Sequence, residues 1–348
     1  MMPEEWPIAA PAADRNAPAR RAGRDRLSTV RLDFFLDSEK RLTEQERALM
    51  TAMLHDLVGG IADEIRAALP LGWAAANDES NVSLVRELAT AGLLDEEGLM
   101  ALLLRRADEQ RIGTAARARA GRHEARAIQG LVSHENGAVS AAAMALILAR
   151  GRRRDRFGQC LVDFDDLPQP SAEGLVNAIA AALRRDIASV RGAAAADAEI
   201  TSAAMRFLAR RDPSRGVDAL TAALVRLLEQ SASPMSDLIL AAAQEGEAGF
   251  IAELLGQRAG VSANQALDEL LSGDAQRLMA LFRIAGFSRE LAAGLLASIG
   301  DLLGIANPGV AIGVFDSLTD EHLRAASVWL ATAPGYRAAI DSLGCPRG

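Results

Sequence analysis

The chain has 348 residues and a formal net charge of −8, so it is long enough for about two domains and a large buried core. Half of its residues are hydrophobic but only 4% are aromatic, so Ala and Leu supply most of the apolar content. Ala and Leu favour helices, whereas the β-branched and aromatic residues that favour strands are scarce. The composition therefore predicts an all-α protein.

The cysteines and the apolar runs exclude several further classes. Cys160 and Cys345 lie far apart and belong to no CxxC or Cys/His pattern, which argues against a disulfide framework and a structural zinc site. The longest apolar run, residues 139–149, is shorter than the ~20 residues that span a bilayer. Glu4 and Glu5 oppose a positively charged leader. We therefore expect a cytoplasmic protein with no membrane partner.

The N-terminal part is expected to contain a tail and a helical subdomain. Residues 1–25 hold four prolines among Ala and Arg, which predicts a disordered tail, and residues 26–76 form the subdomain. A capping box at Thr43–Glu46 opens its main helix, residues 43–69. Apolar residues centred on Leu57 recur along this helix at three- and four-residue steps. Core packing and a homodimer seam both explain that stripe.

The central part, residues 77–231, contains degenerate helical units that start near Asp95, Ser140 and Ser171. The apolar positions that fall in register are Leu99, Met144 and Leu175, followed by Leu103, Leu148 and Ile179. A short apolar helix that repeats in this way cannot bury its face alone and must stack on its neighbours. The repetition predicts stacked antiparallel helix pairs, a HEAT-like α-solenoid.

Residues 232–348 differ from the central part in their sequence pattern, which predicts a C-terminal helical subdomain. A second capping box is expected at Ser262–Gln265. Gly260, Gly273 and Gly286 follow at thirteen-residue intervals, at helix ends where a left-handed C-cap favours Gly. We therefore expect short, closely connected helices here.

Three segments resemble a known family. Residues 238–296, which begin LILAAAQEGE, resemble the C-terminal signature of an uncharacterised proteobacterial family, catalogued as domain of unknown function 2336. Residues 31–69 are similar to its N-terminal signature, and residues 93–106, LLDEEGLMALLLRR, to its repeated helix. The resemblance implies an all-helical, HEAT-like protein over most of residues 27–343. It implies no reaction and no site residue.

The residues that usually carry chemistry are few or unsuitably spaced. None of the four histidines pairs with another His or a Cys at ligand spacing. The acidic run 163–166 is followed by Pro168 and Pro170 where an EF-hand needs ligands. The sequence also contains no nucleophile elbow and no phosphate loop. We therefore expect a protein that is not an enzyme, without catalytic residues, cofactor or metal.

Charge is the most informative functional feature. Residues 32–100 carry a net charge of −9 and residues 101–160 a net charge of +7. The positive block includes Arg150, Arg152, Arg153, Arg154 and Arg156. Solvated helix ends, a surface for an acidic protein or for residues 32–100, and a nucleic-acid patch all explain it. Phe157, the one aromatic in the block, supplies little base stacking.

Together these features predict a non-enzymatic helical-repeat scaffold or regulator. We expect it to bind an unidentified, acidic protein partner through the five arginines at 150, 152, 153, 154 and 156. A nucleic-acid-associated regulator that uses residues 105–156 is the alternative, and an enzyme with an unrecognised site comes third.

Overall fold

The computed structural model describes residues 43–71, 73, 81–121, 126–231 and 235–343. Across these residues the chain is helical, with one isolated antiparallel bridge and no strand, which confirms the predicted all-α class. The predicted tail, and the part of the N-terminal subdomain before residue 43, lie outside the described residues.

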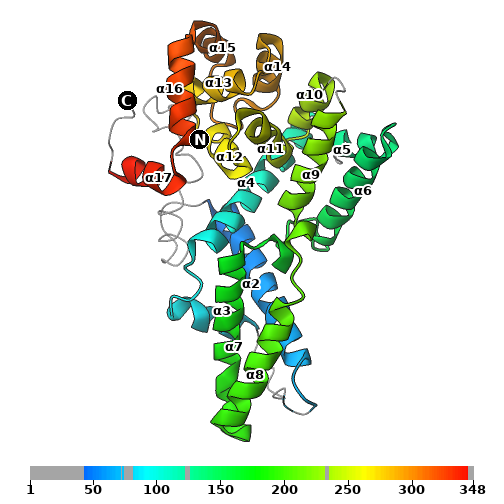
Figure 1. The fold of residues 1–348 in the computed structure, drawn as a ribbon, viewed down its shortest axis with the longest axis vertical. Coiled ribbons are helices and arrows are strands. Elements are labelled where there is room, and N and C mark those ends of the chain that lie inside the picture. The colour runs from blue at the N-terminus through cyan, green and yellow to red at the C-terminus, as the bar shows by residue number, and fades with distance from the viewer. Residues whose placement is uncertain (1–42, 72, 74–80, 122–125, 232–234, 344–348) are drawn as a thin grey trace, which may run out of the picture.

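The helices form two lobes, each with its own hydrophobic core (Figure 1). The lobe at the bottom of Figure 1, called the lower lobe below, contains α2 (Glu44–Ala67), α3 (Asn81–Thr90), the first half of α4 (Glu97–Arg119), α7 (Gln169–Arg191) and α8 (Ala193–Leu208). The helices α7 and α8 form a long antiparallel hairpin that packs against α2. The chain reverses between them at Gly192, whose φ of +85° is accessible to glycine.

Helix α2 begins as the sequence predicts. The Thr43 hydroxyl accepts the Glu46 N–H at 3.2 Å, and the Glu46 carboxylate accepts the Thr43 N–H at 3.1 Å. Leu57 is 4% exposed, which confirms that the stripe is buried. The stripe packs into the lower-lobe core with α4, α7 and α8 of the same chain. A homodimer through the 43–69 helix would therefore have to use its polar face.

The other lobe, called the upper lobe below, contains the second half of α4 and most of the later helices. These are α5 (Ala127–Gly130), η1 (Leu131–Ser133), α6 (Gly137–Arg152), α9 (Val217–Gln230), α10 (Ser236–Gln244), α11 (Ala248–Ala259), α12 (Ala263–Leu270), α13 (Ala275–Ile284), α14 (Arg289–Ile299), α15 (Pro308–Ser317), α16 (Asp320–Ala331) and α17 (Pro334–Ser342). The three evenly spaced glycines have φ values of +71°, +69° and +72°, as the sequence predicts.

The second capping box forms only in part. Ser262 Oγ accepts the Gln265 N–H at 3.2 Å. The Gln265 side chain does not return to Ser262, because its amide donates to the carbonyl of Leu330 in α16. This side chain therefore ties α12 to α16.

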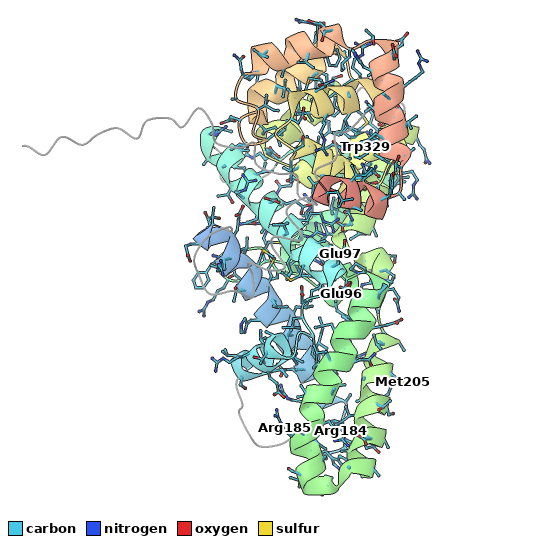
Figure 2. All side chains as sticks on the ribbon, turned by 90° about the vertical axis from the view of Figure 1, so that its left-hand side faces the viewer. Glu96, Glu97, Arg184, Arg185, Met205 and Trp329 are labelled. Atoms are coloured by element: carbon cyan, nitrogen blue, oxygen red, sulfur yellow. The ribbon has the colours of Figure 1, made fainter. Side chains whose placement is uncertain are left out.

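Helix α4 joins the two lobes. Its residues from Leu99 to Ala107 belong to the lower core, whereas Ile112 and Ala116 belong to the upper core. Figure 2 shows its start, at Glu96 and Glu97, at the level where the lobes meet. The Glu96 carboxylate caps the helix, accepting the N–H groups of the second and third helical residues at 2.9 and 2.8 Å.

The order of helices in space departs from their order in the chain. Helix α6 packs against α9 in the upper lobe, although α7 and α8 lie between them in sequence and belong to the lower lobe. The short helices η2 (Phe164–Asp166) and η3 (Pro213–Arg215) lie side by side where the chain leaves the upper lobe and where it returns.

Helix α6 also departs from the repeat alignment. Leu99 and Leu175 are buried, but Met144 is 42% exposed and Leu148 is 52% exposed. The buried residues of α6 are instead Val139, Ala143, Leu146 and Ala149. Because this helix is apolar on nearly every side, its sequence does not define one buried face. The common register predicted for the three units is wrong for α6.

Candidate functional site: the arginine-rich junction of the lobes

The five predicted arginines lie at the end of α6 and in the loop that follows it. Residues 153–161 double back, and the Asp155 N–H donates to the Gln159 carbonyl at 3.0 Å. The Asp155 carboxylate accepts the N–H groups of Phe157 and Gln159 at 2.8 Å each. Gly158 completes the turn with a φ of +78°. Phe157 therefore stands at the tip of a braced loop, where it is 74% exposed.

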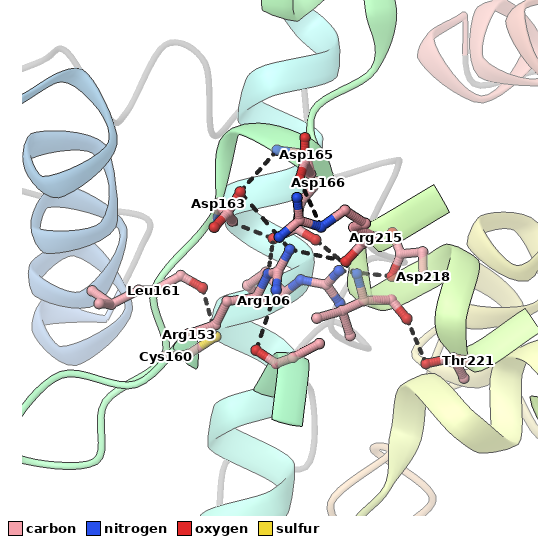
Figure 3. A network of polar contacts seen from close by, with 12 residues as sticks. Arg106, Arg153, Cys160, Leu161, Asp163, Asp165, Asp166, Arg215, Asp218 and Thr221 are labelled. Atoms are coloured by element: carbon pink, nitrogen blue, oxygen red, sulfur yellow. Dashed lines mark hydrogen bonds and ion pairs between the residues drawn. The ribbon is translucent and has the colours of Figure 1, made fainter. Parts of the chain in front are cut away.

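Arg153 points into the protein and is 7% exposed. Its Nε donates to Asp166 Oδ2 at 2.6 Å, and its Nη atoms donate to the carbonyls of Ala149 and Arg215 at 3.2 Å each (Figure 3). Arg153 thus forms an internal ion pair, and the partner contact predicted at this residue stays a prediction. The cause is the fold of the loop, which turns this guanidinium toward the acidic run.

The acidic run serves as a connector between the lobes. Asp166 Oδ1 accepts the N–H of Val217, the first residue of α9, at 2.8 Å, and Oδ2 accepts the Asp163 N–H at 3.0 Å. Asp165 accepts the Asp212 N–H at 2.8 Å. These bonds hold the outgoing and returning segments together. Among the described residues no group of three or more His, Cys, Asp or Glu side chains is placed to hold a metal ion.

A second ion-pair cluster joins α4 to α9. Arg106 is 4% exposed and donates to Asp218 Oδ1 and Glu109 Oε2 at 2.7 Å each. Arg105 donates to Asp218 Oδ2 and to the Asn264 side chain. Desolvation alone would raise the pKa of Asp218, but the positive charges of Arg105 and Arg106 outweigh it and lower the pKa to about 2. Asp218 is therefore ionised at neutral pH.

The other four predicted arginines have different surroundings. Arg150 pairs with Glu247 at 2.6 Å. Arg152 and Arg154 are exposed, and Arg154 donates to the Gly158 carbonyl at 3.1 Å. The guanidinium carbon of Arg156 lies 4.7 Å from the centroid of the Phe157 ring. The structure thus brings Arg150 and Arg154 to a cleft and leaves Arg152 and Arg156 on the outer surface.

That cleft, which we call the arginine cleft, has a volume of about 120 Å³. It lies between α4, the loop after α6, α9, α11 and α12. Six of its lining residues are arginines, namely Arg105, Arg106, Arg117, Arg150, Arg153 and Arg154. Four are acidic, namely Glu109, Asp218, Glu247 and Glu253. The lining therefore has an excess of positive charge.

Cys160 also lines the arginine cleft. Burial raises the pKa of its thiol to about 11, and nearby arginines do not offset this. Because the thiolate is the reactive form of cysteine, this thiol is a poor nucleophile at neutral pH.

Sequence reasoning missed Arg105, Arg106, Arg117, Asp218 and Glu247 as a group. The charge block contained the arginines, but Asp218 and Glu247, the carboxylate partners of Arg106 and Arg150, lie about 100 residues further along the chain. Local periodicity carries no information on such pairing. One arginine of the positive block contacts the acidic segment 32–100: Arg111 Nε lies 3.6 Å from Glu46 Oε1.

Across the described residues these features define a helical protein of two lobes joined at a charged junction. Residues 87–320 match the family described as "Uncharacterised protein conserved in bacteria (DUF2336)", and the chain belongs to that family. The match includes residues 93–106 and 238–296, whereas residues 31–69 lie outside it. Comparison with curated proteins and with solved structures found no match. None of the described helices combines the length and apolar content needed to cross a membrane.

Proposed function

We propose that this protein is a non-enzymatic helical scaffold or regulator that binds an acidic segment of another protein. The observation that carries the proposal is the outer surface of α6 and the loop after it. This surface, which we call the α6 surface, consists of Met144, Leu148, Arg152, Arg156 and Phe157. All five side chains are exposed.

The composition of the α6 surface suits protein recognition. Met144, Leu148 and Arg152 are four residues apart, so they lie along one face of the helix. Exposed apolar residues that form a row are more informative than scattered ones. Methionine adapts its shape to a partner, and exposed aromatic and Arg residues often contribute most to binding energy.

The charge of the α6 surface favours an acidic partner. Arg152 and Arg156 present guanidinium groups that match carboxylates, next to apolar side chains. An amphipathic helix with acidic residues along one edge offers both kinds of group. We therefore propose such a helix as the bound segment.

Nucleic acid is less well matched by this surface. Of the five arginines at 150–156, Arg150 and Arg153 are engaged in internal ion pairs, which leaves Arg152, Arg154 and Arg156 exposed. A protein that contacts three phosphates of duplex DNA would show a salt dependence of only about 3 in log–log slope. Base stacking would depend on Phe157, and Arg156 already lies over that ring.

The HEAT-like relationship also belongs to this proposal. Helix α9 packs against α11, and α11 packs against α12, so neighbouring helices form a stack of the kind seen in helical scaffolds. The excursion of α7 and α8 into the lower lobe would then be an insertion between two stacked units.

The test is partner capture from the native cell with a tagged protein. Arg152→Glu/Arg156→Glu should reduce recovery of the specific partner at least tenfold, because it reverses the charge of the surface. Wild-type capture should also weaken between 50 and 500 mM NaCl, since salt screens charge steering. Arg153 stays unchanged in this variant because it is buried.

The matched control is Arg184→Glu/Arg185→Glu at the far end of the lower lobe (Figure 2). Both side chains are exposed; Arg184 pairs with Asp197 and Arg185 with Glu87 at the surface. The control makes the same charge change and should leave capture intact. Equal recovery by all three proteins would refute the α6 surface as the binding site. A DNA or RNA partner would instead support the alternative function.

A further inference from the structure

The arginine cleft contains positive charge that its own carboxylates do not neutralise. Arg117 in α4 has no ion pair with a carboxylate among the described residues, and its Nη1 makes only a long bond of 3.4 Å to the Glu245 carbonyl. Arg154 likewise donates only to a carbonyl. Arg150 is the third arginine of this group, and it forms an ion pair with Glu247. Three guanidinium groups from three segments thus face one cleft, and among the described residues only Arg150 of the three pairs with a carboxylate.

The electrostatics of Arg117 agree with this geometry. Burial lowers the pKa of Arg117, and the positive charges of Arg154 and Arg150 lower it further, against the opposing effect of Glu247 and Glu245. The Glu245 carboxylate is engaged elsewhere, because it accepts two backbone N–H groups at the start of α5 at 2.8 Å each. The guanidinium groups that line the cleft therefore repel one another when no anion is bound.

The first turn of α11 also lines the arginine cleft. Gly246 has a φ of +69°, and a Cβ atom there would lie 2.7 Å from the Ile112 carbonyl, so only glycine allows α11 to start this close to α4. The N-cap residue, Glu247, makes no capping bond with its side chain. Glu109 also faces this turn, near Gly249, with its other oxygen held by Arg106. The positive end of the helix dipole adds to the field of the arginines.

The size of the cleft limits what it can hold. A volume of about 120 Å³ is below the ~300–1,000 Å³ typical of pockets that enclose a whole small molecule. A single carboxylate has two oxygens and is satisfied by one guanidinium fork. Three forks suit a group with more oxygens and up to two negative charges, which is the chemistry of a phosphate group.

We propose that the arginine cleft is a binding site for a phosphate group, held by Arg117, Arg150 and Arg154. The group belongs either to inorganic phosphate or to a small phosphate ester. A larger groove of about 850 Å³ adjoins the cleft, and the two share Arg105, Asp218 and Asn264 in their linings. That groove leaves room for the organic part of an ester.

Isothermal titration calorimetry in a phosphate-free buffer of fixed ionic strength tests the site, with inorganic phosphate, phenyl phosphate and acetate as the probes. Phosphate or its ester should bind, and acetate should bind at least tenfold more weakly. Tighter binding of phenyl phosphate would assign an ester, and tighter binding of inorganic phosphate would assign the free ion. Acetate that binds as well as both, or no binding of either phosphate probe, would overturn the proposal.

Arg117→Gln is the informative variant, because Arg117 lies away from the α6 surface and has no carboxylate partner to orphan. It should weaken phosphate binding at least tenfold. The melting temperature without phosphate should stay the same or rise, since the change removes repulsion from Arg150 and Arg154. Arg119→Gln, on the same helix but outside the cleft and paired with Asp301, is the matched control. Equal losses in both variants would mean nonspecific charge attraction and would refute the site.

The proposed phosphate site and the proposed partner-binding α6 surface can be refuted separately, because different residues form them. Arg152→Glu/Arg156→Glu should keep phosphate binding within twofold of wild type, because neither residue lines the cleft. Arg117→Gln should in turn keep partner capture.

Discussion

Asp166 is the residue whose replacement should reveal how strongly the junction holds the lobes together. Asp166→Asn keeps the shape of the side chain, which is 1% exposed, but removes its charge. The Asn amide has one acceptor oxygen, so an NH₂ group must face either Arg153 or Val217, both of which donate. A buried donor left without an acceptor costs about 1–3 kcal/mol, and breaking a buried ion pair by changing one partner costs about 3–5 kcal/mol. We expect a total loss of about 3–5 kcal/mol.

Urea unfolding followed by circular dichroism at 222 nm measures this loss. Asp163→Asn is the matched control, since Asp163 is 47% exposed and lies 3.9 Å from Arg153. A long contact of this kind with a solvent-exposed carboxylate contributes about 0–1 kcal/mol. Adding Arg153→Met to Asp166→Asn should cost less than the two separate losses combined, because the orphaned charge is gone. If Asp166→Asn were no less stable than Asp163→Asn, the inference that Asp166 holds the two lobes together would be refuted.

Three further expectations follow from burial and charge. Leu57→Asp should unfold the lower lobe, because it places a charge in a closed core, and a melting temperature equal to wild type would contradict this. The Asp218 carboxyl has a folded-state pKa of about 2, lowered from 3.8, so its stabilisation is present above about pH 4 and is lost as the pH falls through about 2. Asp218→Asn should therefore show a smaller loss of stability between pH 4 and 2 than wild type, and equal losses would argue against the ion pairs. In a Cys345→Ser background, Cys160 should react slowly with iodoacetamide at pH 8 and rapidly after unfolding in urea, as mass spectrometry would show; rapid reaction of the native protein would contradict a neutral, half-buried thiol.

The sequence predicts well those features that depend on near neighbours in the chain. The capping box at Thr43 and the buried stripe around Leu57 follow from spacing within one helix, and the structure confirms both. Helix α6 shows where this reasoning ends. Its residues are apolar on nearly every side, so contacts with α9, η1 and α5 decide that Leu146 is buried and Leu148 exposed.

The candidate site could be predicted only as a composition. The excess of arginine between residues 101 and 160 is visible in the sequence and does mark the junction. The direction of each side chain is not visible there. Arg152 and Arg153 are neighbours, yet Arg152 is exposed and Arg153 is buried against Asp166. The difference arises because residues 153–161 double back and bring the acidic run 163–166 next to Arg153.

The passage of the chain between the lobes has a consequence for folding during synthesis. The lower core needs α2, the start of α4, α7 and α8, so it stays incomplete until residue 208 has left the ribosome. Helix α6 emerges before that point, but it cannot bury its apolar residues against α9 until residue 230 has emerged, because α9 ends at Gln230. Domains usually fold as units and N-terminal ones first, whereas here an upper-lobe helix is exposed while the lower lobe closes. The apolar helix α6 is therefore exposed to aggregation on the nascent chain until α9 has emerged.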